Sequence, residues 1–115
     1  MGRDDGVRPL TAAEFQILVA LADGEKHGYA IGKEVVRRTD GQTVLRAATL
    51  YTVIKRLLDE GLVAESAARP DSALDDERRR YYRLSDRGRK AAEVEAARLE
   101  ETVRQARVKL KLRKA

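Results

Sequence analysis

Residues 47–63 read Ala47-Ala48-Thr49-Leu50-Tyr51-Thr52-Val53-Ile54-Lys55-Arg56-Leu57-Leu58-Asp59-Glu60-Gly61-Leu62-Val63. Aliphatic side chains recur every three or four positions in this stretch, which predicts an amphipathic helix with one buried stripe. Gly61 gives this helix a left-handed stop, and Leu62 supplies the hydrophobic contact that commonly follows such a stop. The opposite face of the helix carries polar and charged side chains, at Thr49, Thr52, Lys55, Arg56 and Asp59.

Two shorter helices are predicted before this stretch. Residues 1–9 are polar and contain glycine, so they are expected to form a flexible N-terminal arm. Thr11 and Glu14 have the spacing of a capping box, which predicts a first helix over residues 11–22. Apolar residues at helical spacing predict a second helix over residues 28–38.

A β-hairpin and a long helix are predicted after this stretch. Residues 62–66 and 79–84 have the alternation of short strands, and residues 67–78 between them have the composition of a charged loop. Ser85 can cap a final helix over residues 86–112. The apolar residues of this helix follow a heptad spacing, at Ala92, Ala96, Leu99, Val103, Ala106 and Leu110.

The length of this last helix predicts a dimer. A helix of roughly 27 residues is about 40 Å long, which is longer than a core of three short helices can cover. The apolar seam therefore needs another partner, and the same helix of a second copy across a two-fold axis is the simplest one. The alternatives are that the seam packs wholly on its own domain, or that the end of the helix frays.

The composition excludes several classes of protein. The chain has 115 residues, of which 43% are hydrophobic and 37% charged, as expected for one compact domain. It has no cysteine and a single histidine, His27, so disulfides, cysteine nucleophiles and thiolate metal sites are excluded. His27 is interpreted as a structural residue at a helix start. No serine has a histidine and an aspartate to activate it, so we expect no catalytic site, no metal and no cofactor.

The sequence gives no reason to expect a membrane protein. No stretch approaches about 18 uninterrupted apolar residues, and the N-terminus lacks the apolar region of a signal peptide. A cytoplasmic location is therefore the default expectation. A basic tail lying on an anionic membrane is a weaker alternative, because its only apolar anchors are Val108, Leu110 and Leu112.

The positive charge is concentrated in two regions. The net charge is +5, yet residues 78–90 contain seven basic residues and one acidic residue, and residues 104–115 contain six basic residues and no acidic one. The rest of the chain is acidic overall. This distribution favours the binding of a polyanion through a defined face, and the alternative is that both regions are solvated charge runs.

The order helix, helix, helix, strand, charged tip and strand is that of a winged helix-turn-helix. The expected fold is mainly α with a small β-hairpin. It divides into a flexible arm (1–9), a winged helix-turn-helix DNA-binding domain (10–85) and a C-terminal dimerisation helix with a basic tail (86–115). The polar face of the helix over residues 47–60 can lie in a major groove while its aliphatic stripe anchors the domain. Hairpin arginines can then reach the DNA backbone or the minor groove.

Three segments of the sequence are characteristic of one protein family in their order and spacing. They are His27-Gly28-Tyr29, residues 48–63 with Ala48-Thr49-Leu50-Tyr51 and Asp59-Glu60-Gly61-Leu62-Val63, and Arg79-Arg80-Tyr81-Tyr82-Arg83-Leu84-Ser85-Asp86-Arg87-Gly88. With them the chain resembles the PadR family of bacterial transcriptional regulators from Leu10 to about Leu112. The single helix after the hairpin looks like the short C-terminal subgroup, which includes homodimeric repressors of multidrug efflux genes.

The resemblance implies a homodimeric, sequence-specific DNA-binding regulator, with repression as the expected activity, acting on a pseudo-palindromic double-stranded operator. It places the DNA-binding residues at Tyr29, Thr49, Tyr51, Thr52, Lys55 and Arg56, and on the wing at Arg78, Arg79 and Arg80. For Tyr51 the alternative is simple packing, and Tyr82 is expected in the core. The alternative function is a protein-interaction module that keeps the winged-helix fold without specific DNA recognition.

The chain departs in one position from the drug-sensing members of this subgroup. Those members resemble one another in an aromatic residue, commonly tryptophan, that stacks on flat ligands from the last helix. Here no residue after Tyr82 is aromatic, and Leu99 occupies the nearest seam position. Stacking on a flat ligand is therefore lost, and the effector expected for this chain is a small hydrophobic molecule in an aliphatic pocket.

Overall fold

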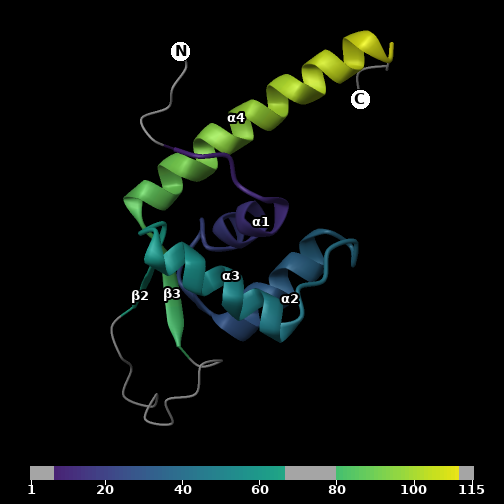
Figure 1. The fold of residues 1–115 in the computed structure, drawn as a ribbon. Coiled ribbons are helices and arrows are strands. Elements are labelled where there is room, and N and C mark those ends of the chain that lie inside the picture. The colour runs from purple at the N-terminus through teal and green to yellow at the C-terminus, as the bar shows by residue number, and fades with distance from the viewer. Residues whose placement is uncertain (1–6, 67–79, 112–115) are drawn as a thin grey trace.

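The computed structural model describes residues 7–66 and 80–111. They form α1 (Ala12–Ala20), β1 (Lys26–His27), α2 (Gly28–Arg38), α3 (Ala47–Asp59), β2 (Val63–Glu65), β3 (Tyr81–Leu84) and α4 (Asp86–Lys109). Figure 1 shows α1 beside the first half of α4, with α2 and α3 beyond α1. The expected mainly helical fold with a small sheet is confirmed. Most of the predicted arm, the hairpin tip and the end of the basic tail lie outside the described residues.

Side-chain caps fix where three of the helices begin. Thr11 and Glu14 form the expected capping box, with bonds of 3.1 Å and 2.8 Å between each side chain and the other residue's N–H. Nδ1 of His27 accepts a hydrogen bond from the N–H of Ala30 at 3.1 Å and so caps α2. Ser85 caps α4 in the same way. His27 therefore has a structural role at a helix start, as its position in the sequence suggested.

The predicted hairpin is part of a three-stranded sheet. β2 and β3 are antiparallel, with Val63 opposite Leu84 and Glu65 opposite Tyr82. β1 pairs with the other edge of β3, so the strand order is β1-β3-β2. β1 was not predicted from the sequence, because two residues are too few to show an alternating pattern. The pairing of β1 depends on tertiary contact with β3.

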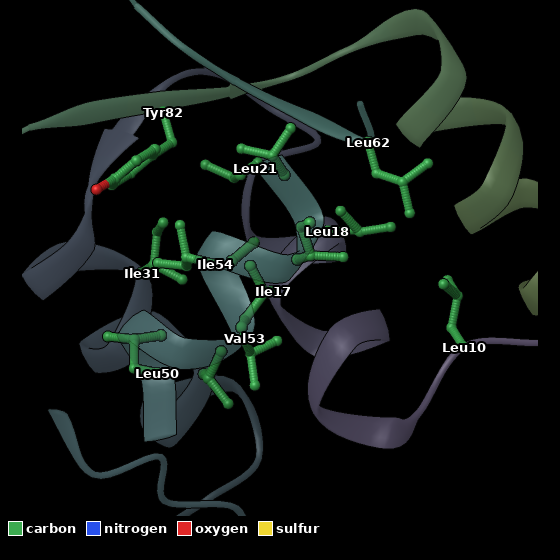
Figure 2. Close-up of a cluster of buried hydrophobic side chains, with 14 of the residues drawn as sticks. Leu10, Ile17, Leu18, Leu21, Ile31, Leu50, Val53, Ile54, Leu62 and Tyr82 are labelled. Carbon is green, nitrogen blue, oxygen red and sulfur yellow. The ribbon is translucent and has the colours of Figure 1, made fainter. Parts of the chain in front are cut away.

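The core lies between the three N-terminal helices and the sheet (Figure 2). Its largest fully buried apolar side chains are Ile17, Leu18, Leu21, Ile31, Ile54, Leu57 and Val35. The aliphatic stripe of α3 is therefore buried, as predicted. Tyr82 is 3% exposed, which confirms that it belongs to the core. This packing holds the opposite face of α3 at the surface.

Only the first half of α4 packs against the domain. Ala91 and Glu95 are buried, and the carboxylate of Glu95 accepts a hydrogen bond from the N–H of Leu10 at 3.0 Å. Beyond these residues the helix projects away from the other elements (Figure 1). Leu99 and Val103, which belong to the predicted apolar seam, are exposed.

Two helices are shorter than predicted. α1 ends at Ala20 rather than Ala22, and the turn that follows contains Gly24. α4 ends at Lys109 rather than near residue 112, because Lys111 adopts a left-handed backbone conformation with a φ of 56°. Both differences concern the last turn, where sequence patterns define a helix least well.

Candidate nucleic-acid interface

The outer face of α3 is the candidate surface for nucleic acid. One side of the helix is buried, at Leu50, Val53, Ile54 and Leu57. The other side is exposed, at Thr49, Thr52, Lys55, Arg56 and Asp59. The side chain of Lys55 is 77% exposed, and its ammonium lies 3.7 Å from the carboxylate of Asp59. So exposed a pair is weak, and Lys55 can exchange Asp59 for a phosphate or a base edge.

Arg56 is engaged by its own domain. Its Nε donates a hydrogen bond of 2.9 Å to Oε2 of Glu14 on α1. The side chain is nevertheless 44% exposed. Arg56 was expected to lie wholly on the outer face of α3. Its side chain is partly exposed there, but its Nε faces Glu14 on α1. The spacing along α3 could not reveal the pair, because the partner lies on a different helix.

Tyr51 turns toward α2 rather than toward the outer face of α3. Its hydroxyl is buried, and a Cβ added at Gly28 would overlap the Tyr51 ring. The ring thus uses the space that a glycine leaves at the start of α2. This placement does not fit the expected hydroxyl contact with DNA. It fits the alternative, in which Tyr51 packs.

Tyr29 lies on the exposed side of α2. It is 57% exposed, and its ring is stacked with His27 at a centroid distance of 6.4 Å. Nζ of Lys33, one turn further on, lies 5.2 Å from the centre of the Tyr29 ring. Lys33 and Arg37 follow Tyr29 at intervals of four and are both exposed. This row of cationic side chains was not predicted from the sequence, although residues four apart on a helix lie on one face.

The wing is described only where it joins the sheet. Arg80 immediately precedes β3, and its Nε lies 3.7 Å from Oε2 of Glu65 on β2. Both side chains are exposed by more than two fifths, so this pair is at the surface. The other two predicted wing contacts, Arg78 and Arg79, lie outside the described residues.

An ionic network joins α1, α3 and the segment before α1. Both carboxylate oxygens of Glu14, a fully buried residue, accept hydrogen bonds from the guanidinium of Arg8, at 2.9 Å and 2.8 Å. Arg8 also donates to Glu60 at the end of α3, at 2.7 Å. The Arg8 guanidinium, helped by the N–H of Thr11 and by Arg56, lowers the pKa of Glu14 from 4.5 to about 2, although burial opposes this change.

The lowered pKa of Glu14 makes stability depend on pH. The network stabilises the fold fully above the ordinary glutamate pKa of 4.5 and is lost as the pH falls toward 2. We expect Glu14→Gln to lower the free energy of unfolding by about 2 to 3 kcal/mol at neutral pH, with the difference shrinking toward pH 2. Urea unfolding at a series of pH values measures it.

A matched control is available on α4. Arg104 and then Gln105 also lower the pKa of Glu101 to about 2, but this group is fully exposed. Solvent screens such a pair, so Glu101→Gln should change stability little at any pH. A Glu14→Gln loss that persists unchanged at pH 2 would mean that the charge of Glu14 is not its cause.

The described residues contain neither a metal site nor a membrane span. Within residues 7–66 and 80–111, no group of three or more histidine, cysteine, aspartate or glutamate side chains is arranged to hold a metal ion. No helix in the same ranges is long and apolar enough to cross a membrane. The exposed face of α3 carries threonine, lysine and arginine, which suit hydrogen bonds and ion pairs to nucleic acid.

Several known proteins are similar to this chain in sequence and in fold. The model of the transcriptional regulator PadR-like family matches residues 17–94. The chain belongs to this family. The match includes all of α2, α3 and the sheet, so the candidate interface of this PadR protein lies inside the shared region.

Solved structures extend the comparison to most of this PadR protein. A transcriptional regulator from Clostridium thermocellum is 28% identical, with a TM-score of 0.70 over 89% of this chain and 90% of that one. Bacillus subtilis PadR in complex with operator DNA is 22% identical, with a TM-score of 0.61 over 74% of this chain and 46% of that one. An uncharacterised protein of Lysinibacillus sphaericus is 31% identical over 73 residues, which are 64% of this chain and 64% of that relative.

The predicted dimerisation seam of this PadR protein is divided between two environments. Ala92 packs against the core of its own domain, and Ala96 and Ala106 are partly buried. Leu99, Val103 and Leu110 are exposed by 43%, 49% and 66%. We call these three residues the outer strip. The seam thus changes from an intradomain contact to an uncovered apolar surface where α4 leaves the domain.

Proposed function

We propose that this PadR protein is a homodimeric repressor that binds a pseudo-palindromic DNA operator in a sequence-specific manner in the cytoplasm. The observation that carries the proposal is the division of α3 into two faces. Thr49, Thr52 and Lys55 are exposed on one face, and an aliphatic stripe is buried on the other. A helix divided in this way can enter a major groove while the core stays intact. Support also comes from Bacillus subtilis PadR, a protein of the same fold that is in complex with operator DNA.

The interface residues have different proposed roles. Lys55 and the exposed end of Arg56 contact base edges or phosphates, and Thr49 and Thr52 add hydroxyl hydrogen bonds. Tyr51 packs against the start of α2 and is not proposed to contact DNA directly. Phosphate contacts are assigned to α2 and the wing, at Tyr29, Arg78, Arg79 and Arg80.

The outer strip supports the dimer. Three exposed aliphatic side chains on a projecting helix leave an apolar surface that a second copy can cover. A two-fold axis brings the same strip of each chain together and gives the assembly two copies of α3. Those two helices would read half-sites about one helical turn, ~34 Å, apart.

Base reading by α3 is tested with Lys55→Ala. Selection of bound fragments from random duplex DNA first supplies an operator, its symmetry and its half-site spacing. We expect Lys55→Ala to weaken binding to this operator about tenfold and binding to a random duplex less, because the side chain is free to reach a base edge. Fluorescence anisotropy at fixed salt measures both affinities.

Lys109→Ala is the control, since it removes the same charge from the second basic region, at the far end of α4, and should affect operator and random DNA alike. An equal loss on operator and random DNA would contradict base reading by Lys55. A stable dimer without salt-sensitive binding to any duplex would contradict the repressor and favour a protein-interaction module instead.

A groove between α2 and α3 favours a response to a small hydrophobic effector. Its volume is about 400 Å³, and its lining includes Gly32, Val36, Leu45 and Leu50, with the rings of Tyr29 and Tyr51. This size lies in the range of small-molecule sites. Because Tyr29 belongs to the proposed DNA interface, an effector in this groove would compete with DNA.

The effector site is tested with naphthol, a small hydrophobic probe that the rings of Tyr29 and Tyr51 in this groove, rather than the last helix, can contact. We expect naphthol to bind the protein and to weaken operator binding. Gly32→Leu should reduce both effects, because the new side chain would lie against Leu50, which a Cβ at position 32 already contacts at 3.4 Å. Isothermal titration calorimetry measures naphthol binding. Unchanged naphthol affinity in a folded Gly32→Leu variant would place the probe elsewhere.

A further inference from the structure

The second oxygen of Glu14 does more than a helix cap requires. The capping box uses one oxygen, Oε1, which accepts from the N–H of Thr11. Oε2 instead accepts from Arg8 and from Nε of Arg56, which belongs to α3. A carboxylate this deeply buried is stable only with partners of this kind. Glu14 is therefore a fixed charge directed at one side chain of the proposed interface.

Arg56 bonds to Glu14 through one of its three guanidinium nitrogens, Nε, and its side chain is partly exposed. Within the part of the chain that the structure describes, its guanidinium bonds only to Glu14, through Nε. The side chain is 44% exposed. An arginine side chain is long and flexible, and fixing it in advance reduces the entropy that is lost when its planar fork binds an anion.

Arg8 shares the carboxylate of Glu14 with Arg56. Glu14 is shared by two guanidinium groups, because Arg8 bonds to both of its oxygens. Arg8 is in turn shared with Glu60. The two guanidinium groups and two carboxylates carry no net charge together, so Arg56 can attract a further anion through its outer nitrogens, which are not bonded to Glu14.

We propose that Glu14 is a positioning residue for DNA recognition, which holds the guanidinium of Arg56 through Nε so that its outer nitrogens meet a phosphate or a guanine edge. The proposal rests on the proposed function, because it needs α3 to lie on DNA. It extends that function to a buried residue of α1 that has no access to DNA itself.

The test is a double-mutant cycle on DNA affinity. The probes are the operator duplex selected from random DNA and a random duplex of the same length. The proteins are the wild type, Glu14→Gln, Arg56→Ala and the double variant. We expect either single change to weaken operator binding about tenfold, and Glu14→Gln to cost less than about twofold when Arg56 is already alanine.

Thr11→Ala is the matched structural control. It removes the other half of the same capping box but leaves the bond between Glu14 and Arg56 in place. We expect it to lower thermal stability while operator affinity stays within about twofold of the wild type. A tenfold loss in Thr11→Ala, or equal losses from Glu14→Gln in both backgrounds, would overturn the positioning role.

A second measurement does not depend on the folding of Glu14→Gln. In the nitrogen-15 NMR spectrum of the free wild type, Nε–H of Arg56 should give a slowly exchanging signal, which is assigned by its absence in Arg56→Ala. A rapidly exchanging signal would overturn the proposal. A wild type that binds no duplex overturns the proposed function and this proposal together, whereas additive losses in a protein that binds DNA overturn this proposal alone.

Discussion

Replacing both Leu99 and Val103 with glutamate is expected to separate the dimer and to lower operator affinity by about a hundredfold or more. Both side chains belong to the outer strip and are exposed in the single chain, so the change does not disturb the domain core. In a paired seam, however, two carboxylates per chain would be buried without partners. A monomer would then bind one half-site at a time and lose the gain from linked binding. Light scattering after gel filtration measures the mass, and fluorescence anisotropy measures the affinity.

Ala97→Glu is the control for this experiment. Ala97 is exposed on the same helix, and two positions place it about 200° around the axis from Leu99. We expect this variant to remain dimeric and to bind the operator as the wild type does. A double variant that stays dimeric would show that the interface lies elsewhere. A monomeric variant with undiminished affinity would contradict reading of two half-sites.

The elements that could be predicted from the sequence are those whose pattern is local. The stripe of α3 repeats within one helix, and the stripe alone determines which face is buried. The caps at Thr11 and Ser85 are equally local, because each side chain bonds to an N–H three residues later. By contrast, β1 has two residues and exists only through its pairing with β3.

The sequence predicted which face of α3 is exposed, but not which residues of other helices the side chains of α3 contact. Lys55 and Thr52 are exposed, as the helical spacing indicated. The spacing could not show that Arg56 meets Glu14, or that Tyr51 fills the space at Gly28, because both contacts depend on how separate helices cross. Helical periodicity assigns an angle around one axis, and a residue near the edge of the polar face can turn toward solvent or toward a neighbouring helix.

Gly88→Ala is expected to destabilise the protein by about 3 kcal/mol or more. Gly88 lies in the first turn of α4, where alanine would normally favour the helix. A Cβ at this position would overlap the carbonyl oxygen of Leu62 and lie 3.0 Å from Cδ1 of Leu84. The Leu62 carbonyl is backbone and already accepts a hydrogen bond from the N–H of Ser85, so it cannot move aside alone. Urea unfolding at one fixed protein concentration measures the loss.

Gly32→Ala is the matched control, because the same substitution in α2 meets only an ordinary contact, 3.4 Å from Cδ2 of Leu50. It should stabilise the protein by up to about 1 kcal/mol, since alanine restricts the unfolded chain. Equal effects of the two changes would contradict the close approach at Gly88. The contact joins the chain that leaves α3 to the start of α4, so a shift there is expected to change the angle between these two helices. A folded Gly88→Ala dimer should therefore bind the operator more weakly than the wild type, with an affinity near that of a single half-site, because the spacing between its two copies of α3 has changed.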